Sequence, residues 1–185
     1  MSLKKLFTYE QAFKDSLKYF KGDDLAASVF LGKYALQNTQ GEYLESNPDM
    51  MHARLAKEFE RIESKYSNPM SYEEIYELFK DFKYVVPQGS PMSGIGNKYQ
   101  IQSLSNCFVI EEPHDSYGGI LKTDQEQVQI MKRRGGVGFD ISSIRPAGMK
   151  TSNAAKTTGG IELFMDRFSN SCREVAQGGR RGALM

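Results

Sequence analysis

Cys107 is the residue of this chain that most readily suggests redox chemistry, because it lies in an apolar run beside polar neighbours. The run, residues 103–110, reads SLSNCFVI, and its valine, isoleucine and phenylalanine favour a buried strand. A lone cysteine in such a strand is most often a small buried hydrophobe. Ser105 and Asn106 instead indicate a cleft, so a redox role for the Cys107 thiol stays open alongside the core role.

A second chemically capable group lies near the C-terminus, where Gly178 and Gly179 precede Arg180 and Arg181. Paired glycines let a backbone approach a ligand closely, and forked guanidinium groups suit phosphate. The alternative for one of the two arginines is a solvated surface position. Because the sequence contains no common mononucleotide-binding motif, it favours only a phosphate-competent loop in an α/β domain.

The elements that would position this loop form a strand–helix–strand unit. Residues 137–141 are a short apolar run, which is typical of a buried strand. A helix is predicted next, since apolar residues recur at helical spacing. This stripe consists of Ile161, Phe164, Met165, Phe168, Cys172 and Val175. A further apolar run follows Arg181, so the unit is predicted to be a βαβ crossover, in which Cys172 belongs to the core.

Residues 1–86 are expected to form helices, because helix-start patterns precede apolar residues at helical spacing. The predicted starts are Thr8 with Gln11, Asp23, Asn47-Pro48, and Ser71 with Glu74. The apolar stripes are interpreted as core, and for the second helix the predicted inner residues are Leu25, Val29 and Leu36.

The segment 87–101 is rich in proline, glycine, serine and asparagine, and it is predicted to be a loop that serves either as linker or as binding segment. After the strand of Cys107, a helix is expected over about 117–134. Its inner residues would be Leu121, Val128 and Met131, and the three basic residues 132–134 would lie in its last turn.

Composition narrows the function classes. The chain has 185 residues, of which 39% are hydrophobic and 25% charged, and its net charge is +1. A net charge this small produces no overall electrostatic field that would attract nucleic acid or a membrane surface. No apolar run is long enough to span a membrane. Two cysteines favour a reducing cytoplasm, and two histidines without a Cys/His cluster predict no metal site.

Four segments, in this order, resemble the catalytic subunit of ribonucleotide reductase, and most closely its adenosylcobalamin-dependent (class II) branch. They read SLSNCFVI, DSYGGI, QEQVQIMKRRGGVGFDISSIRPAG and REVAQGGRRGALM. The resemblance extends from about Asp23 to Met185. It implies an α/β fold in which residues 1–86 form an N-terminal helical segment and residues 87–185 the first part of a ten-stranded α/β barrel. The implied activity is reduction of ribonucleotides to deoxyribonucleotides by radical chemistry.

The resemblance also implies a substrate site. Cys107 matches the first redox cysteine, which supplies an electron pair and ends in a disulfide. Ser90 and Asn106 match positions that touch the ribonucleotide, and Gly135 and Gly136 fall near it.

An effector site is implied as well. Asp115, Ser116 and Tyr117 align with residues that hold a deoxynucleoside triphosphate or ATP effector. Arg145 and residues 146–157 match the first specificity loop, and Arg145 is expected to bind the effector phosphates. The second specificity loop is matched by Gln177, Gly178, Gly179, Arg180 and Arg181.

The family's radical-forming cysteine and second redox cysteine lie beyond the position of Met185. The chain is therefore expected to be an N-terminal portion that is inactive alone. It would work with the remainder of the reductase chain, as a homodimer, and with a thioredoxin- or glutaredoxin-type reductant. The alternatives are the large subunit of an iron- or manganese-radical (class I) reductase and a non-catalytic nucleotide-binding or assembly module.

Overall fold

The computed structural model describes residues 6–175, 183 and 184, and the chain divides into two compact units. The first unit is Met1–Leu104 and the second is Ser105–Met185. The sequence predicted a division after residue 86, whereas the contacts of residues 87–104 place that segment with the helical unit.

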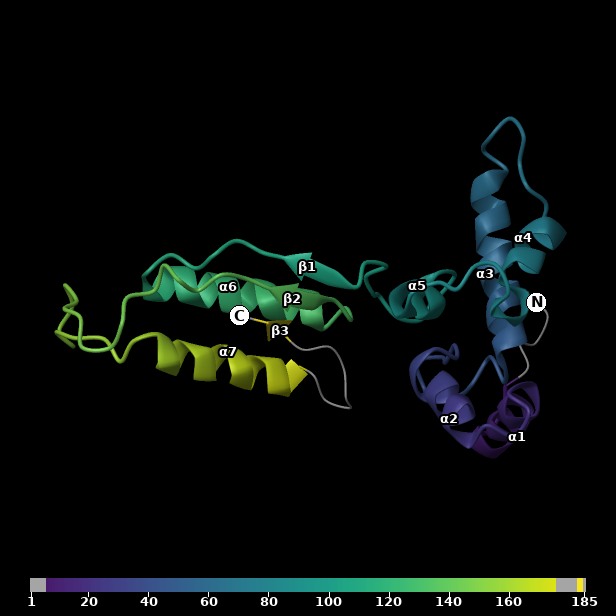
Figure 1. Cartoon of the computed structure of the whole chain (residues 1–185), viewed down its shortest axis with the longest axis horizontal. Helices are drawn as coiled ribbons and strands as arrows, with labels where there is room; N and C mark the ends of the chain where they lie inside the picture. Colours follow the sequence, from purple (N-terminus) through teal and green to yellow (C-terminus); the bar gives the residue numbers. More distant parts are fainter. Residues whose placement is uncertain (1–5, 176–182, 185) are drawn as a thin grey trace. The chain divides into compact units, whose positions relative to one another are not determined.

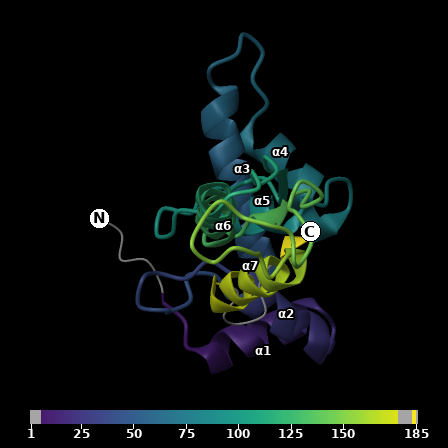
Figure 2. The ribbon, with the colours of Figure 1, turned by 90° about the vertical axis from the view of Figure 1, so that its left-hand side faces the viewer.

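Helices build the first unit. Their bounds are α1 (Tyr9–Tyr19), α2 (Asp24–Lys33), α3 (Pro48–Glu63), α4 (Tyr72–Phe79), the 3-10 turn η1 (Lys80–Phe82) and α5 (Gly89–Gly94). The main packing pairs are α1 with α2 and α3 with α4, which lie side by side in both views (Figure 1, Figure 2).

The predicted helix starts are confirmed. Thr8 Oγ1 accepts from the Gln11 amide, and the Gln11 side chain accepts from the Thr8 amide at 3.1 Å, which completes a capping box. Ser71 and Glu74 repeat this arrangement at α4. The side chains of Asp23 and Asn47 cap α2 and α3. Each cap satisfies backbone amides that a helix start leaves without intrahelical acceptors.

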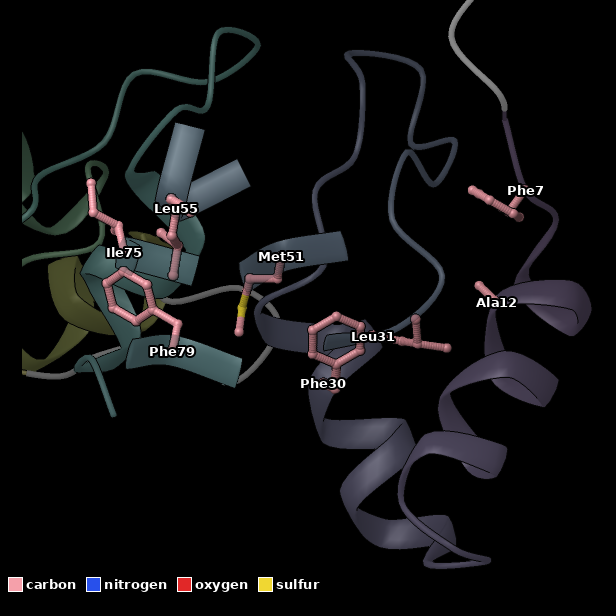
Figure 3. Close-up of a cluster of buried hydrophobic side chains, with 9 residues drawn as sticks. Phe7, Ala12, Phe30, Leu31, Met51, Leu55, Ile75 and Phe79 are labelled. Atoms are coloured by element: carbon pink, nitrogen blue, oxygen red, sulfur yellow. The ribbon is translucent and has the colours of Figure 1, made fainter. Parts of the chain in front are cut away.

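The core of the first unit is formed by α1, α2, α3 and α4. Its buried members are Phe7, Ala12, Phe30, Leu31, Met51, Leu55, Ala56, Ile75 and Phe79. Met51 of α3 lies between Phe30 and Phe79 (Figure 3). The predicted inner face of α2 was wrong at Leu25, which is 74% exposed. Apolar residues surround nearly the whole of α2, so their periodicity does not select one face.

The predicted loop 87–101 contains the short helix α5. Its residues are GSPMSG, a composition typical of loops, so propensity alone does not predict it. The Ser93 hydroxyl donates to the Gly89 carbonyl at 3.0 Å inside this turn. Arg54 from α3 and Gln102 from the segment after α5 donate to carbonyls of α5 and hold it in place.

The second unit contains a parallel sheet whose strands are β1 (Cys107–Val109), β2 (Gly136–Gly138) and β3 (Ala183–Leu184), in the order β1-β2-β3. Helix α6 (Tyr117–Met131) connects β1 to β2, and α7 (Ile161–Val175) connects β2 to β3. The predicted βαβ crossover is therefore confirmed, and α6 and α7 pack against each other (Figure 1).

Phe168 is the centre of the second core. It is fully buried, and its ring meets Phe139 edge-on with centroids 4.9 Å apart. Cys172 packs against the same cluster, which confirms its predicted core position. Met165 is 41% exposed, so it lies outside the buried part of the predicted stripe.

Two predictions about the ends of elements in this unit were wrong. The strand predicted over 103–110 is shorter and is not buried, since Cys107 is exposed and Val109 is 92% exposed. Side chains alternate along a strand, and Phe108 turns toward Gly135 while its neighbours point to the other face.

Helix α6 ends at Met131, so residues 132–134 follow the helix instead of forming its last turn. Arg134 has a φ of 67°, which turns the backbone out of the helix, and Gly135 then donates to the Ile130 carbonyl at 3.2 Å. Leu121, predicted to face inward, is 44% exposed. None of the helices in the described ranges has the length and apolar character that a membrane span requires.

His52 is a buried titratable group in the first core. Its ring is fully buried and meets Phe82 edge-on at 4.6 Å. Neither ring nitrogen has a hydrogen-bond partner among the described residues. Burial lowers the pKa of His52, and the carboxylates of Asp49 and Asp81 oppose this effect. The neutral imidazole is therefore the form that the fold accommodates.

We expect acid to destabilise the chain through His52. The unfolded state takes up a proton near the ordinary pKa of 6.5, whereas the folded state resists it, so stability is full above pH 6.5 and falls below it. The slope contributed by one such group is at most about 1.4 kcal/mol per pH unit. Urea unfolding between pH 8 and pH 5.5 measures it.

His52→Leu should remove this component of the pH dependence, and His114→Gln should retain it, because His114 is exposed. An unfolding free energy with the same pH slope in the unaltered and His52→Leu chains would contradict the assignment.

Candidate functional site

The residues predicted to surround the substrate in the second unit come together at the N-terminal ends of β1 and β2. Cys107 is in register with Gly136, and the Gly136 amide donates to the Asn106 carbonyl at 2.7 Å. Parallel pairing thus places Asn106, Cys107, Gly135 and Gly136 side by side, although they come from sequence positions that a whole helix separates.

A glycine is required at position 135 because the side chains of Ile130 and Phe108 lie close to its backbone. A Cβ built there would lie 2.5 Å from Ile130 Cγ2 and 2.9 Å from Phe108 Cε2. A side chain at this position would push α6 or β1 away from the start of β2. The absence of a side chain therefore allows the compact junction on which the site residues depend.

The two cysteines differ in their surroundings. Cys107 is exposed on β1, while Cys172 is half-buried on α7 against the second core. A thiol takes part in exchange chemistry only when a partner can reach it. Accessibility therefore favours Cys107 as the chemically active thiol of this chain.

Ser90 belongs to the first unit, so the structure brings it together with different residues. It is 2% exposed within α5, and its carbonyl accepts from the Gln102 side-chain amide at 3.2 Å. The same amide donates to Ser93 Oγ at 3.0 Å. The predicted substrate residue therefore lies in a buried polar network.

A groove of about 560 Å³ lies beside α5 in the first unit. Apolar side chains dominate its lining and include Phe59, Ile62, Ile95, Ile101 and Leu104. None of the individual residues predicted to contact substrate or effector lines this groove, but most of residues 94–101, from the segment predicted as linker or binding segment, do. The groove and the predicted substrate residue are thus separate features of the α5 region.

The predicted effector residues meet at the opposite, C-terminal ends of β1 and β2. Arg145 Nε lies 2.5 Å from Asp115 Oδ2, and the two side chains are about one third exposed. Beside this pair, Ser143 Oγ donates to the Pro113 carbonyl at 2.7 Å. These contacts join the loop after β1 to the loop after β2, and the cationic side chain stays accessible.

Residues 146–157 fold back on themselves beside Arg145. Lys150 and Thr157 form an antiparallel bridge, and Arg145 Nη1 donates to the Lys150 carbonyl at 2.9 Å. At the base of the loop Gly160 has a φ of +80°, and a Cβ there would meet the Ala147 amide nitrogen at 2.2 Å. Arg145 thus ties the loop to Asp115 and to the start of α6.

Ser116 and Tyr117 have structural partners at this end. Ser116 Oγ caps α6 by accepting from the Gly119 amide at 3.1 Å. Tyr117 is 67% exposed, and its ring meets Phe164 of α7 edge-on at 5.8 Å. Sequence reasoning missed Phe164 and Ser143 as neighbours. The position of Ser143 just after a parallel strand was the signal that could have identified it.

The residues matched to the second specificity loop, Gln177, Gly178, Gly179, Arg180 and Arg181, lie outside the described residues. Within the described part of the chain, no three His, Cys, Asp or Glu side chains are grouped as ligands for a metal ion.

Residues 105–185 match the family described as the barrel domain of ribonucleotide reductase. This range coincides with the second compact unit. Its three parallel strands and two crossover helices are consistent with part of such a domain. The matched range also contains Asn106, Cys107, Asp115 and Arg145.

Relatives across several groups of organisms are ribonucleoside-diphosphate reductases. The vitamin B12-dependent enzyme of Mycobacterium tuberculosis is 27% identical over 86% of this chain, which corresponds to 23% of its own length. The large subunit of Trypanosoma brucei brucei is 26% identical over 99% of this chain and 21% of its own length. Large chain 2 of Saccharomyces cerevisiae is 37% identical over 42% of this chain and 9% of its own length.

We expect an alkylating reagent to distinguish the two thiols. Iodoacetamide should modify Cys107 first, because Cys107 is exposed while Cys172 packs against the core. Peptide mass spectrometry over a time course measures each rate.

In Cys107→Ser, only the slow alkylation of Cys172 should remain. In Cys172→Ala, only the fast alkylation of Cys107 should remain. Equal rates at both positions in the folded chain would show that exposure does not separate them.

Proposed function

We propose that this chain forms part of the large chain of a ribonucleoside-diphosphate reductase, in which Cys107 is one of the two redox thiols. The observation that carries the proposal is the exposed thiol of Cys107 within the segment that matches the reductase barrel domain. The matched range begins two residues before this cysteine. The ten-stranded barrel is the fold in which these three strands would lie.

The proposed reaction removes the ribose 2′-hydroxyl as water. Two thiols supply two electrons and two protons and become a disulfide, while the substrate gains hydrogen at C2′. Cys107 would be one thiol; Cys172 is packed in the core of the second unit, so the other comes from the remainder of the polypeptide. A thioredoxin- or glutaredoxin-type protein would reduce the disulfide by thiol exchange.

The neighbours of Cys107 support substrate binding at the same end of the sheet. Asn106 precedes the thiol directly, and Gly136 lies opposite the thiol in the parallel register. Gly135 and Gly136 stay predicted neighbours of the substrate: both are buried, and their amides donate to the Ile130 and Asn106 carbonyls. Ser90, which the resemblance also matches to a substrate position, stays a prediction, and its side chain is buried within the first unit.

We propose adenosylcobalamin as the radical source, because the relatives named vitamin B12-dependent match most of this chain. The large subunit of Trypanosoma brucei brucei matches at similar identity, and it supports the class I alternative. Of the two histidines, His52 does not suit cobalt ligation, because its imidazole is fully buried against Phe82, whereas His114 is exposed.

The pair Asp115–Arg145 is the proposed effector contact. Asp115 could accept from a ribose hydroxyl and Arg145 could hold triphosphate oxygens in a bidentate fashion. The apolar residues Leu121 on α6 and Leu163 and Met165 on α7 are exposed in the single chain. These side chains support pairing of the two helices with a second copy, as a homodimer.

Replacing Cys107 tests the proposed reaction. In the complete polypeptide that carries this sequence, Cys107→Ser should abolish ribonucleoside diphosphate reduction with dithiothreitol, because no disulfide can form. Cys172→Ala is the matched control and should retain turnover while costing about 1 kcal/mol of stability. Deoxynucleotide formation is assayed with and without adenosylcobalamin. Normal turnover by Cys107→Ser would contradict the proposed role of this thiol. Turnover without adenosylcobalamin would favour the class I alternative.

Replacing Arg145 tests the effector site. Arg145→Ala should weaken deoxynucleoside triphosphate binding by about 1.5–3 kcal/mol, the contribution of a charged hydrogen bond, while reduction without effector persists. Arg133→Ala is the control, since Arg133 is exposed and its side chain donates to the Gln129 carbonyl one helical turn earlier. Calorimetry measures affinity, and light scattering measures whether the effector strengthens a dimer. Unchanged affinity in Arg145→Ala would place the site elsewhere.

A further inference from the structure

The guanidinium of Arg145 is engaged on both of its two-donor edges within the second unit. On one edge, Nε lies 2.5 Å from Asp115 Oδ2, and Nη2 donates to the Asp115 carbonyl at 3.5 Å. On the other edge, Nη1 donates to the Lys150 carbonyl at 2.9 Å. A planar guanidinium offers an oxyanion two parallel donors only along such an edge. A phosphate can therefore bind Arg145 in a bidentate fashion only by displacing one of these partners.

The two partners of Arg145 differ in how they compete with a phosphate. The Asp115 carboxylate is itself an anion, so it neutralises the guanidinium and repels a second anion from the same position. The Lys150 carbonyl is neutral, and it belongs to the loop that Arg145 already ties down. The ion pair is about one third exposed on each side, and ion pairs this exposed stabilise a fold only slightly. The carboxylate is thus the partner that a polyanion would replace.

The loop that follows Arg145 carries further positive charge. Lys150 and Lys156 are both exposed, and the antiparallel bridge between Lys150 and Thr157 places them on the two adjacent arms of this loop. Neither lysine has an ion-pair partner among the residues that the structure describes. Together with Arg145 they suit a ligand with several negative charges, such as a triphosphate.

We propose that Asp115 is an internal anion that blocks Arg145 against inorganic phosphates and is displaced by a triphosphate whose sugar hydroxyl it can bind. The inference deepens the proposed function and rests on it, because Arg145 is the effector contact there. Inorganic polyphosphate would displace the carboxylate without offering it a new partner. A nucleotide offers a ribose hydroxyl, from which the displaced carboxylate can accept a charge-assisted hydrogen bond. Asp115 would thereby make the site selective for nucleotides.

The experiment measures the affinity of inorganic tripolyphosphate and of 2′-deoxyadenosine triphosphate by calorimetry, in the complete polypeptide that carries this sequence. Tripolyphosphate has the phosphates of the nucleotide without its sugar and base. Asp115→Asn removes the charge and keeps the shape, and it is combined with Arg145→Ala in a double variant. The control is Glu111→Gln, which removes a carboxylate four residues earlier that is exposed and pairs with Lys122. Ionic strength is held constant, because salt screens exposed charges.

In Asp115→Asn we expect tripolyphosphate to bind about three- to tenfold more tightly, because a like charge has been removed beside a partly exposed cation. The gain should disappear in the double variant with Arg145→Ala. The nucleotide should gain less than tripolyphosphate, since the neutral amide is a weaker acceptor for the sugar hydroxyl. Glu111→Gln should match the unaltered polypeptide with both ligands.

Tripolyphosphate binding that depends on Arg145 but is no tighter in Asp115→Asn would overturn the inference and leave the effector contact standing. An equal gain in Glu111→Gln would overturn it as well, since the cause would then be overall charge. An equal gain for both ligands would show that Asp115 does not discriminate between them, which also contradicts the inference. Binding that Arg145→Ala leaves unchanged, or no binding of either ligand, would refute the proposed effector contact and the inference with it.

Discussion

Parallel pairing of β1 with β2 and of β2 with β3 is the constraint on which the second unit depends. Parallel neighbours cannot be joined by a tight turn, so the chain must cross over through α6 and α7. All loops that leave the strands then lie at one end of the sheet, and all loops that enter them lie at the other. This separation explains why Asp115 meets Arg145 while Asn106 meets Gly136.

Local signals in the sequence predicted the parts of the fold that local chemistry determines. The capping boxes at Thr8 and Ser71 follow from side chains and amides three residues apart. The βαβ order and the proximity of Asp115 to Arg145 follow from topology once the strands are identified. Burial of individual side chains was harder to predict, because it depends on which face of a helix or strand other elements cover. Cys107 is exposed for this reason, although its run of apolar neighbours is typical of a core strand.

The buried polar groups of the first unit were beyond sequence reasoning. In the sequence, Arg54 is one of several charged residues on an amphipathic helix. Nothing in its spacing predicts that its side chain contacts both Glu45 and the end of α5. Removing one partner from such a pair commonly costs about 3–5 kcal/mol, because the other charge stays buried. His52 is also buried in this core, but it carries no charge there, since burial lowers its pKa and keeps the ring neutral. The buried Arg54 guanidinium keeps its charge where the Glu45 carboxylate and the Met92 and Ile95 carbonyls converge on it.

On the proposed function, effector and substrate act at opposite ends of the same short strands. A strand residue rises about 3.3 Å, so a three-residue strand spans about 10 Å, or nearly two turns of a helix. Helices α6 and α7, with 15 residues each, are longer, about 22 Å. Polar contacts join them: Gln127 donates to the Phe168 carbonyl at 3.0 Å, and Arg167 Nε lies 3.1 Å from Asp124. An effector that shifts the Arg145 loop would thus act on a pair of helices that are fastened together, and the pair would move with less freedom than either helix alone.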